Sequence, residues 1–318
     1  MNKVSVIIPC YNEAQSLPLL HTELCKLAES EQHYEWEFLF INDGSRDTTI
    51  NELEKLREKD ARCNYVDLSR NYGKEVALLA GFDYASGDCA VIMDADLQHP
   101  PHVVHEMLRK WEEGYEDVYA RRISRGKESW LRKQLSLSYY RLLSKSTRID
   151  VLPNVGDFRL LDRRCLDALC QLREQSRYTK GMYCYIGFKK TFVDFETQDR
   201  VAGESSMSYH VLVKLAIEGL TAYTTSPLQW ATGIGIIVSI TSFLYAFWVI
   251  IKTLVWGEPV AGFPTMMIAI LFLGGVQLLS LGIIGEYLGR VFNETKNRPV
   301  YFVQSFNGDK YEKSRKHH

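Results

Sequence analysis

Two carboxylates one residue apart, Asp94 and Asp96, follow the apolar run 91–93 and precede Gln98 and a Pro-Pro break. In an extended chain alternate side chains point to the same side, so the two carboxylates can converge on one point. Neighbouring carboxylates repel each other unless a cation lies between them. Carboxylate and amide oxygens favour a hard divalent ion, so the pattern predicts an Mg²⁺ or Mn²⁺ site at Asp94, Asp96 and Gln98. For an isolated Asp-x-Asp pair, a surface turn is the more common interpretation.

Two further polar clusters follow apolar runs earlier in the chain. Tyr11-Asn12-Glu13 comes after residues 4–9, and Asp43-Gly44-Ser45 comes after residues 36–41. Predicted strands and helices alternate with short connections, which indicates a doubly wound, mostly parallel α/β sheet. Ligands of such sheets bind outside the carboxyl ends of the strands. We therefore expect the three clusters, including the one at Asp94, to line one cleft.

The spacing of apolar residues gives the expected elements. It predicts helices over residues 16–28, 48–59, 75–85, 100–113 and 135–143, and strands over residues 4–9, 36–41, 63–68, 89–93, 117–120 and 191–195. A turn at Gly156-Asp157 is expected to lead into a further apolar strand that ends near Leu161.

Composition narrows the class of protein. The 318 residues carry a formal net charge of -1, which does not fit a nucleic-acid-binding surface. The seven cysteines include no C-x-x-C pair, and an odd, scattered set indicates reduced thiols in the cytosol. Because the N-terminus enters a predicted strand directly, we expect no signal peptide.

Two uncharged stretches, residues 231–251 and 265–284, are each long enough to cross a bilayer. An even number of spans places the basic tail on the same side as the N-terminal domain, and the positive-inside rule makes that side cytoplasmic. Residues 208–223 suit either an amphipathic helix on the membrane surface or an ordinary packed helix. The expected organisation is a catalytic domain at 1–206, an interfacial helix at 207–227, a two-helix transmembrane hairpin at 228–288 and a basic tail at 289–318. Gly285 and Gly289 allow close helix packing and hence a homo-oligomer.

The order of the polar motifs resembles that of the inverting family-2 glycosyltransferases. The motifs are Pro-x-Tyr-Asn-Glu at 9–13, Asp-Gly-Ser-x-Asp at 43–47, Arg-Asn-x-Gly-Lys-Glu at 70–75 and Asp-x-Asp-x-Gln at 94–98. Residues 154–160 and 285–299 are similar to those of polyprenyl-phosphate glycosyltransferases of the bactoprenol glucosyltransferase type, relatives of the dolichyl-phosphate mannose synthases. The resemblance covers nearly the whole chain and implies a nucleotide-diphosphate-sugar-binding fold of the GT-A type.

The resemblance also implies roles for individual residues. It assigns the donor nucleotide to Pro9, Tyr11, Asn12, Glu13, Asp43, Asp94, Ala95 and Arg200, the metal to Asp94, Asp96 and Gln98, catalysis to Asp157 and Asp96, and the acceptor phosphate to Arg122 and Arg132. Relatives often read Gly-x-Ser-Lys where this chain has residues 203–206 as Gly-Glu-Ser-Ser, so any phosphate contact of that lysine is absent or moved here.

The implied activity is transfer of glucose from UDP-glucose to undecaprenyl phosphate at the cytoplasmic face of the inner membrane. A flippase and a periplasmic glycosyltransferase would then use the lipid-linked sugar to modify a surface glycan such as O-antigen. One alternative is the same reaction with mannose, N-acetylglucosamine or an aminoarabinose. Another is a membrane scaffold that binds a sugar nucleotide without turnover. A processive synthase fits less well, because no Gln-x-x-Arg-Trp element occurs.

Several polar residues have an ordinary interpretation beside the functional one. His99, His102 and His105 are expected on a helix surface, because their spacing does not suit a metal site. Lys74 suits either a contact to the donor or a surface lysine at a helix start. The remaining residues with such an alternative are Tyr11 (packing), Asp43 (a turn) and Arg122 and Arg132 (a solvated basic face).

Overall fold

A computed structural model of the chain describes residues 1–123, 155–175, 177–196, 226–256 and 262–310. The chain divides into two compact units. The first contains Met1–Leu212 together with Pro299–His318, and the second is Val213–Arg298. The residues after the second unit therefore belong with the N-terminal unit and do not form a separate tail from residue 289.

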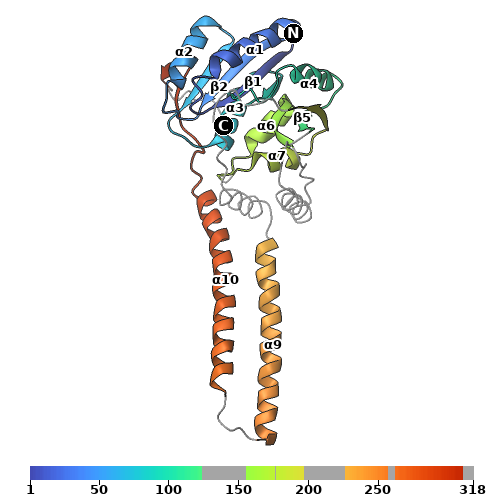
Figure 1. Cartoon of the computed structure of the whole chain (residues 1–318), viewed down its shortest axis with the longest axis vertical. Helices are drawn as coiled ribbons and strands as arrows, with labels where there is room; N and C mark the ends of the chain where they lie inside the picture. Colours follow the sequence, from blue (N-terminus) through green and yellow to red (C-terminus); the bar gives the residue numbers. More distant parts are fainter. Residues whose placement is uncertain (124–154, 176, 197–225, 257–261, 311–318) are drawn as a thin grey trace. The chain divides into compact units, whose positions relative to one another are not determined.

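The first unit is built on one sheet of nine described strands in the order β7-β5-β6-β4-β1-β2-β3-β8-β9. Its elements are β1 (Lys3–Cys10), α1 (Leu17–Ser30), β2 (Glu35–Asn42), α2 (Thr49–Lys59), β3 (Cys63–Leu68), α3 (Lys74–Tyr84), β4 (Cys89–Ile92), α4 (Val103–Glu112), β5 (Asp117–Arg122), β6 (Val155–Asp162), α6 (Arg163–Gln171), α7 (Thr179–Tyr185), β7 (Lys190–Phe195), β8 (Val303–Phe306) and β9 (Asp309–Lys310). Figure 1 shows this unit, coloured from blue to yellow-green between β1 and β7 and red at β8 and β9.

Strand directions make the sheet mixed. β1 pairs in parallel with β2 and β4, β2 with β3, and β5 with β7. β6 runs antiparallel between β4 and β5, and β8 runs antiparallel to β3. The doubly wound α/β fold is confirmed, and its central strands are parallel as predicted.

Helices cover both faces of the sheet because side chains of one strand alternate between faces. Val4, Val6 and Ile8 of β1 belong to the core shared with α1, α2 and α4. Ile7 points to the opposite face, where α3 packs on β1 and β2. A Cβ on Gly81 of α3 would lie 2.3 Å from Ile7 Cγ2, so the glycine permits this close approach. Each fully buried aliphatic side chain contributes about 1.5–3 kcal/mol to this packing.

The segment around Asp157 differs from the prediction. Gly156 and Asp157 were expected in a turn, but both lie inside β6. The strand begins at Val155, which is opposite Arg121, and reaches Arg159, which is opposite Ile92. Pairing with strands on both sides keeps the backbone extended through the glycine, which overrides its weak preference for a strand.

The C-terminal residues also differ from the expected tail. β8 adds to the edge of β3, with Val66 opposite Phe306 and Leu68 opposite Val303. Asn307 continues this edge, since its backbone N–H donates to Tyr65 O at 3.0 Å and its side-chain oxygen accepts from Tyr65 N at 2.8 Å. The segment thus satisfies backbone groups that an edge strand would otherwise leave unpaired.

The second unit contains two long helices, α9 (Ser226–Trp256) and α10 (Phe263–Thr295), which lie side by side (Figure 1). Within the described residues one segment, Phe272–Thr295, is long and apolar enough to cross a membrane, with a mean hydropathy of 1.3. The pair of membrane spans therefore stays a prediction. The expected helix at 135–143 and residues 207–225 of the expected interfacial helix at 207–227 lie outside the described residues, and residues 226 and 227 belong to α9.

Candidate active site

The Asp94–Asp96 segment forms a tight loop directly after β4. Asp94 N donates to His99 Nδ1 at 3.1 Å, and Gln98 N donates to Asp96 Oδ1 at 3.1 Å. Leu97 adopts a left-handed conformation, with φ of 60°, which turns the chain back. The loop therefore holds both carboxylates at the carboxyl end of a central strand. Gln98 contacts Asp96 through its backbone, and metal binding by its side chain stays a prediction.

An ion-pair bridge links this loop to β6. Lys74 Nζ lies 2.5 Å from Asp94 Oδ1 and 3.1 Å from Asp157 Oδ2. Burial lowers the pKa of the Lys74 ammonium, but the carboxylates of Asp94 and Asp157 outweigh burial and hold that pKa above its ordinary value. Lys74 is indeed a lysine at a helix start with a 42% exposed side chain, but it is also part of the site, and its contact with the donor stays a prediction. Its ammonium lies between two predicted site carboxylates.

Asp157 lies on β6 with its side chain only 11% exposed. Burial raises the pKa of its carboxyl, yet the nearby ammonium groups of Lys74 and Lys180 outweigh burial and leave that pKa below its ordinary value. Asp157 is consequently ionised at neutral pH. Its Oδ1 is buried and has no hydrogen-bond partner among the described residues.

A pocket of about 310 Å³ collects the residues of the three polar clusters. Its walls include most of the residues predicted to bind the donor and the metal, namely Pro9, Tyr11, Glu13, Asp43, Asp94, Ala95 and Asp96. The common cleft expected from the strand ends is present. Which group each residue binds stays a prediction.

Asn12 and Asp43 hold loops beside this pocket. The side-chain oxygen of Asn12 accepts from Arg46 N at 2.8 Å, and its N–H donates to Ser45 Oγ. Buried Asp43 accepts from the backbone N–H groups of Tyr72 at 2.7 Å and Gly73 at 2.9 Å. Asp43 thereby fixes the turn that leads into Lys74, the first residue of α3. In this structure both residues position backbone, and contact with uridine stays a prediction.

Gly44 allows the Asp43 loop to pack against the Arg70–Asn71 backbone. Its φ is +61°, and a Cβ at this position would lie 2.3 Å from Arg70 C. A side chain would force the two loops apart, and an L-residue is strained at this φ. The backbone conformation and the close packing of the two loops therefore explain why the Asp-Gly-Ser motif has glycine at its second position.

The prediction that His99 lies on a helix surface is wrong. Its residue is 2% exposed, and its ring stacks on Phe158 with centroids 4.6 Å apart. Burial lowers the pKa of His99, so the imidazole is neutral at physiological pH and can accept from Asp94 N. His99 is buried because the segment after the Asp94–Asp96 loop packs on β6. This contact between distant segments cannot be predicted from the local spacing of residues. His102 is exposed as expected, and His105 Nδ1 pairs with Glu31 at 2.6 Å.

His99→Ala should lower the affinity for Mn²⁺ roughly 10- to 100-fold, because removal of an outer partner of a ligand loop typically has that effect. It leaves the Asp94 N–H without its acceptor and removes the stacking on Phe158. Titration of Mn²⁺ by electron paramagnetic resonance measures the affinity. His102→Ala, an exposed histidine close in sequence, serves as the control and should change nothing. Equal Mn²⁺ affinity in the wild type and His99→Ala would show that the loop does not depend on this ring.

Of the residues predicted to bind the acceptor phosphate, only Arg122 is described. It lies at the end of β5 and is half-buried. Its positive charge helps to lower the pKa of His99, after the larger effect of burial. Arg132, and Arg200 of the donor set, lie outside the described residues.

Arg159 is a supporting residue that the sequence analysis did not single out. Its guanidinium forms a buried ion pair with Asp117, 3.1 Å away, and lies over the ring of Tyr183, 3.6 Å from the centroid. Arg159 also donates to Gly156 O at 3.3 Å. These contacts fix β6 beside Asp157. The sequence does contain a sign of this role, because Arg159 is a charged residue inside a mostly apolar strand. A buried charge of this kind requires a partner of opposite charge.

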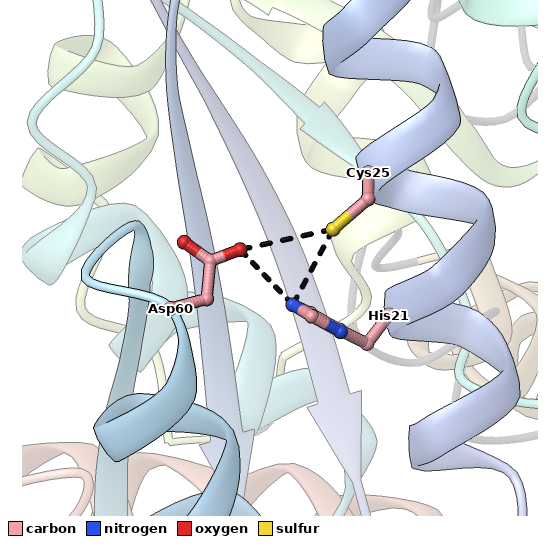
Figure 2. Close-up of side chains that lie close together, drawn as sticks. All are labelled: His21, Cys25 and Asp60. Atoms are coloured by element: carbon pink, nitrogen blue, oxygen red, sulfur yellow. Dashed lines mark hydrogen bonds and ion pairs between the residues drawn. The ribbon is translucent and has the colours of Figure 1, made fainter.

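A second group of ligand-type side chains lies elsewhere in the first unit (Figure 2). His21 and Cys25 of α1 approach Asp60 at the end of α2, with His21 Nε2 3.0 Å from Asp60 Oδ2. Arg62 Nη2 donates to Asp60 Oδ2 at 2.8 Å and to Cys25 Sγ at 3.3 Å. Hydrogen bonds from Arg62 lower the pKa of Asp60, so the guanidinium already supplies the positive charge. The cluster joins α1 to the turn before β3.

Comparison with known proteins covers both units. The sequence pattern described as glycosyl transferase family 2 matches residues 5–170, and that of the GtrB C-terminal hairpin matches residues 226–291. An uncharacterized glycosyltransferase of Synechocystis is 42% identical over 309 residues, 97% of this chain and 97% of its own. The SfII prophage-derived bactoprenol glucosyl transferase of Shigella flexneri is 39% identical over 302 residues, 95% of this chain and 97% of its own. The prophage bactoprenol glucosyl transferase homolog of Escherichia coli is 36% identical over 302 residues, 95% of this chain and 98% of its own.

Proposed function

The chain belongs to glycosyl transferase family 2 and is a glycosyltransferase, and from this premise we propose that it transfers glucose from UDP-glucose to undecaprenyl phosphate. The names of relatives similar over nearly their whole length support the glucosyl group and the bactoprenol acceptor. The observation that carries the proposal is the pocket at the strand ends, where Asp94, Asp96 and Lys74 lie together and Asp157 is paired with Lys74.

The pocket suits a sugar nucleotide with a divalent ion. Asp94 and Asp96 offer hard oxygen ligands on one loop, and Gln98 is two residues further along the chain. Carboxylate and amide oxygens are ligands that fit Mg²⁺ or Mn²⁺. When bound, the ion would neutralise the leaving diphosphate as a Lewis acid. The pocket residues Pro9, Tyr11, Glu13 and Ala95 would surround the nucleotide, and Asn12 and Asp43 hold the loops beside it.

The acceptor determines what Asp157 has to do. In the reaction a phosphate oxygen attacks the anomeric carbon from the face opposite the diphosphate, the bond to the leaving oxygen breaks, and UDP departs. A phosphomonoester has its second pKa near about 6, so the nucleophile is largely ionised already. Asp157, whose pKa lies below its ordinary value, is suited to orienting the acceptor and to stabilising positive charge on the sugar ring. Arg122 and Arg132 would bind the lipid phosphate, and Arg200 the donor diphosphate.

The two long helices support a location of this chemistry at a membrane. α9 is 31 residues long, and its one charged residue is Lys252. α10 is 33 residues long, and its charged residues lie in its last third, from Glu286 onward. We assign both helices to the inner membrane with both chain ends cytoplasmic, so that the product would pass to a flippase and a periplasmic glycosyltransferase. The small residues Gly285 and Gly289 would allow copies to associate.

Transfer of radiolabel from UDP- and GDP-sugars to undecaprenyl phosphate, with Mg²⁺ and with chelator, tests the proposal. Label should enter the lipid from UDP-glucose alone, and removal of the metal should abolish it until Mg²⁺ or Mn²⁺ is restored. Label from mannose, N-acetylglucosamine or aminoarabinose donors would keep the reaction and replace the sugar. Nucleotide binding with no labelled lipid from any donor would contradict the proposal and favour a scaffold.

A further inference from the structure

We propose that Lys74 competes with the divalent metal for Asp94 and moves to the diphosphate of the sugar nucleotide when the metal binds. This inference rests on the proposed function, because it concerns the same pocket. It adds a coupling between two ligands, in which the metal binds weakly alone and tightly together with the nucleotide.

The position of Lys74 follows from the way α3 begins. The preceding residue, Gly73, has its N–H held by Asp43 Oδ2 at 2.9 Å, and this fixes the backbone at the helix start. From there the Lys74 side chain places Nζ 2.5 Å from Asp94 Oδ1 and 3.1 Å from Asp157 Oδ2. Because the side chain is long and flexible, the ammonium can leave Asp94 without any movement of the helix.

The observed contact conflicts with a metal bound to Asp94. A divalent ion binds a carboxylate oxygen at about 2.0–2.6 Å, close to the place that Nζ occupies on Asp94 Oδ1. Two cations on one carboxylate also repel each other strongly in a partly buried site. A metal on Asp94 Oδ1 therefore requires Lys74 to leave this oxygen, and this exchange weakens the affinity for the metal alone.

The charges of the pocket indicate where the ammonium goes. Lys74 is the one basic side chain among the described residues that line the pocket, whereas the acidic ones are Glu13, Asp43, Asp94 and Asp96. A diphosphate entering this acidic pocket needs positive charge beyond that of the metal. Lys74 remains tethered to Asp157 and can supply that charge. Metal and diphosphate should then favour each other, and by thermodynamic linkage the effect is equal in both directions.

Mn²⁺ binding to the full-length protein, measured by electron paramagnetic resonance with and without UDP, tests the coupling without sugar transfer. Lys74→Met should bind Mn²⁺ alone about tenfold more tightly than the wild type, because the competing cation is gone. The factor by which UDP tightens Mn²⁺ binding should fall in this variant. Lys74→Arg, which keeps the charge, should stay closer to the wild type in Mn²⁺ affinity.

Lys180→Met is the matched control. Lys180 also acts on Asp157 through its charge, but among the described residues no ion pair joins it to Asp94. An equal rise in Mn²⁺ affinity in Lys180→Met would show an effect of net charge and overturn the inference. So would unchanged Mn²⁺ affinity in a Lys74→Met protein with a wild-type melting temperature. Failure of the wild type to bind Mn²⁺ or UDP at all would instead contradict the proposed function.

Discussion

Asp157→Asn is expected to reduce turnover by roughly 100- to 1,000-fold, the range found when one preorganised electrostatic contact to a transition state is removed. The amide keeps the size of the side chain but loses the negative charge that would stabilise the sugar ring and orient the acceptor. The Kd for UDP should change much less, because Asp157 does not line the donor pocket and reaches it only through its ion pair with Lys74. Steady-state kinetics with lipid acceptor and calorimetry with UDP give the two quantities.

Asp167→Asn controls for the loss of one carboxylate. Asp167 is exposed on α6 and pairs only loosely with Arg163, 3.6 Å away. Both variants should melt near the wild-type temperature. Equal losses of turnover and UDP affinity in Asp157→Asn would refute the division of roles between Asp157 and the donor pocket.

Removal of the C-terminal segment from Pro299 onward should have the second large effect, loss of a stably folded first unit. It deletes β8 and exposes the edge of β3, where each unpaired backbone group loses about 0.5–1.5 kcal/mol of net hydrogen bonding. It also removes the hydrogen bond from Tyr301 OH to Asp83 Oδ2 (2.6 Å) and the packing of Phe306 on Tyr84. We expect aggregation or a melting temperature lower by more than about 10 °C, measured on detergent-solubilised protein.

A shorter truncation, after Lys310, isolates the effect of the strand. It retains β8 and β9 and should melt like the full chain. Asn307→Ala should fall between the two, because it removes the side-chain acceptor of Tyr65 N while β8 remains. A truncation at Arg298 that melts like the full-length protein would show that the tail is dispensable for the fold.

The alternation of strands and helices was predictable because each early element has a clear apolar period. The α1 leucines Leu17, Leu20, Leu24 and Leu27 are all buried, as their helical spacing indicates. The rule that ligands bind outside the carboxyl ends of parallel strands was equally informative. It predicted that the clusters at Tyr11, Asp43 and Asp94 would meet, and all three line one pocket.

Contacts between distant segments were not predictable from local patterns. β8 is a short edge strand of mixed polarity, Val-Gln-Ser-Phe, whose pairing with β3 depends on a partner over two hundred residues away in sequence. The burial of His99 depends on Phe158 of β6, and the role of Lys74 depends on Asp157 of the same strand. In each case an antiparallel strand from a later part of the chain supplies the partner, and no spacing in the sequence specifies that approach.

The proposed reaction at this site is the transfer of a sugar onto a lipid phosphate in one displacement. Its most direct test is analysis of the product formed from UDP-glucose and undecaprenyl phosphate by mass spectrometry and by nuclear magnetic resonance of the anomeric proton. A single displacement on α-linked UDP-glucose should give one hexose per lipid in the β configuration. An α-configured product, or free glucose and UDP with unmodified lipid, would contradict this mechanism.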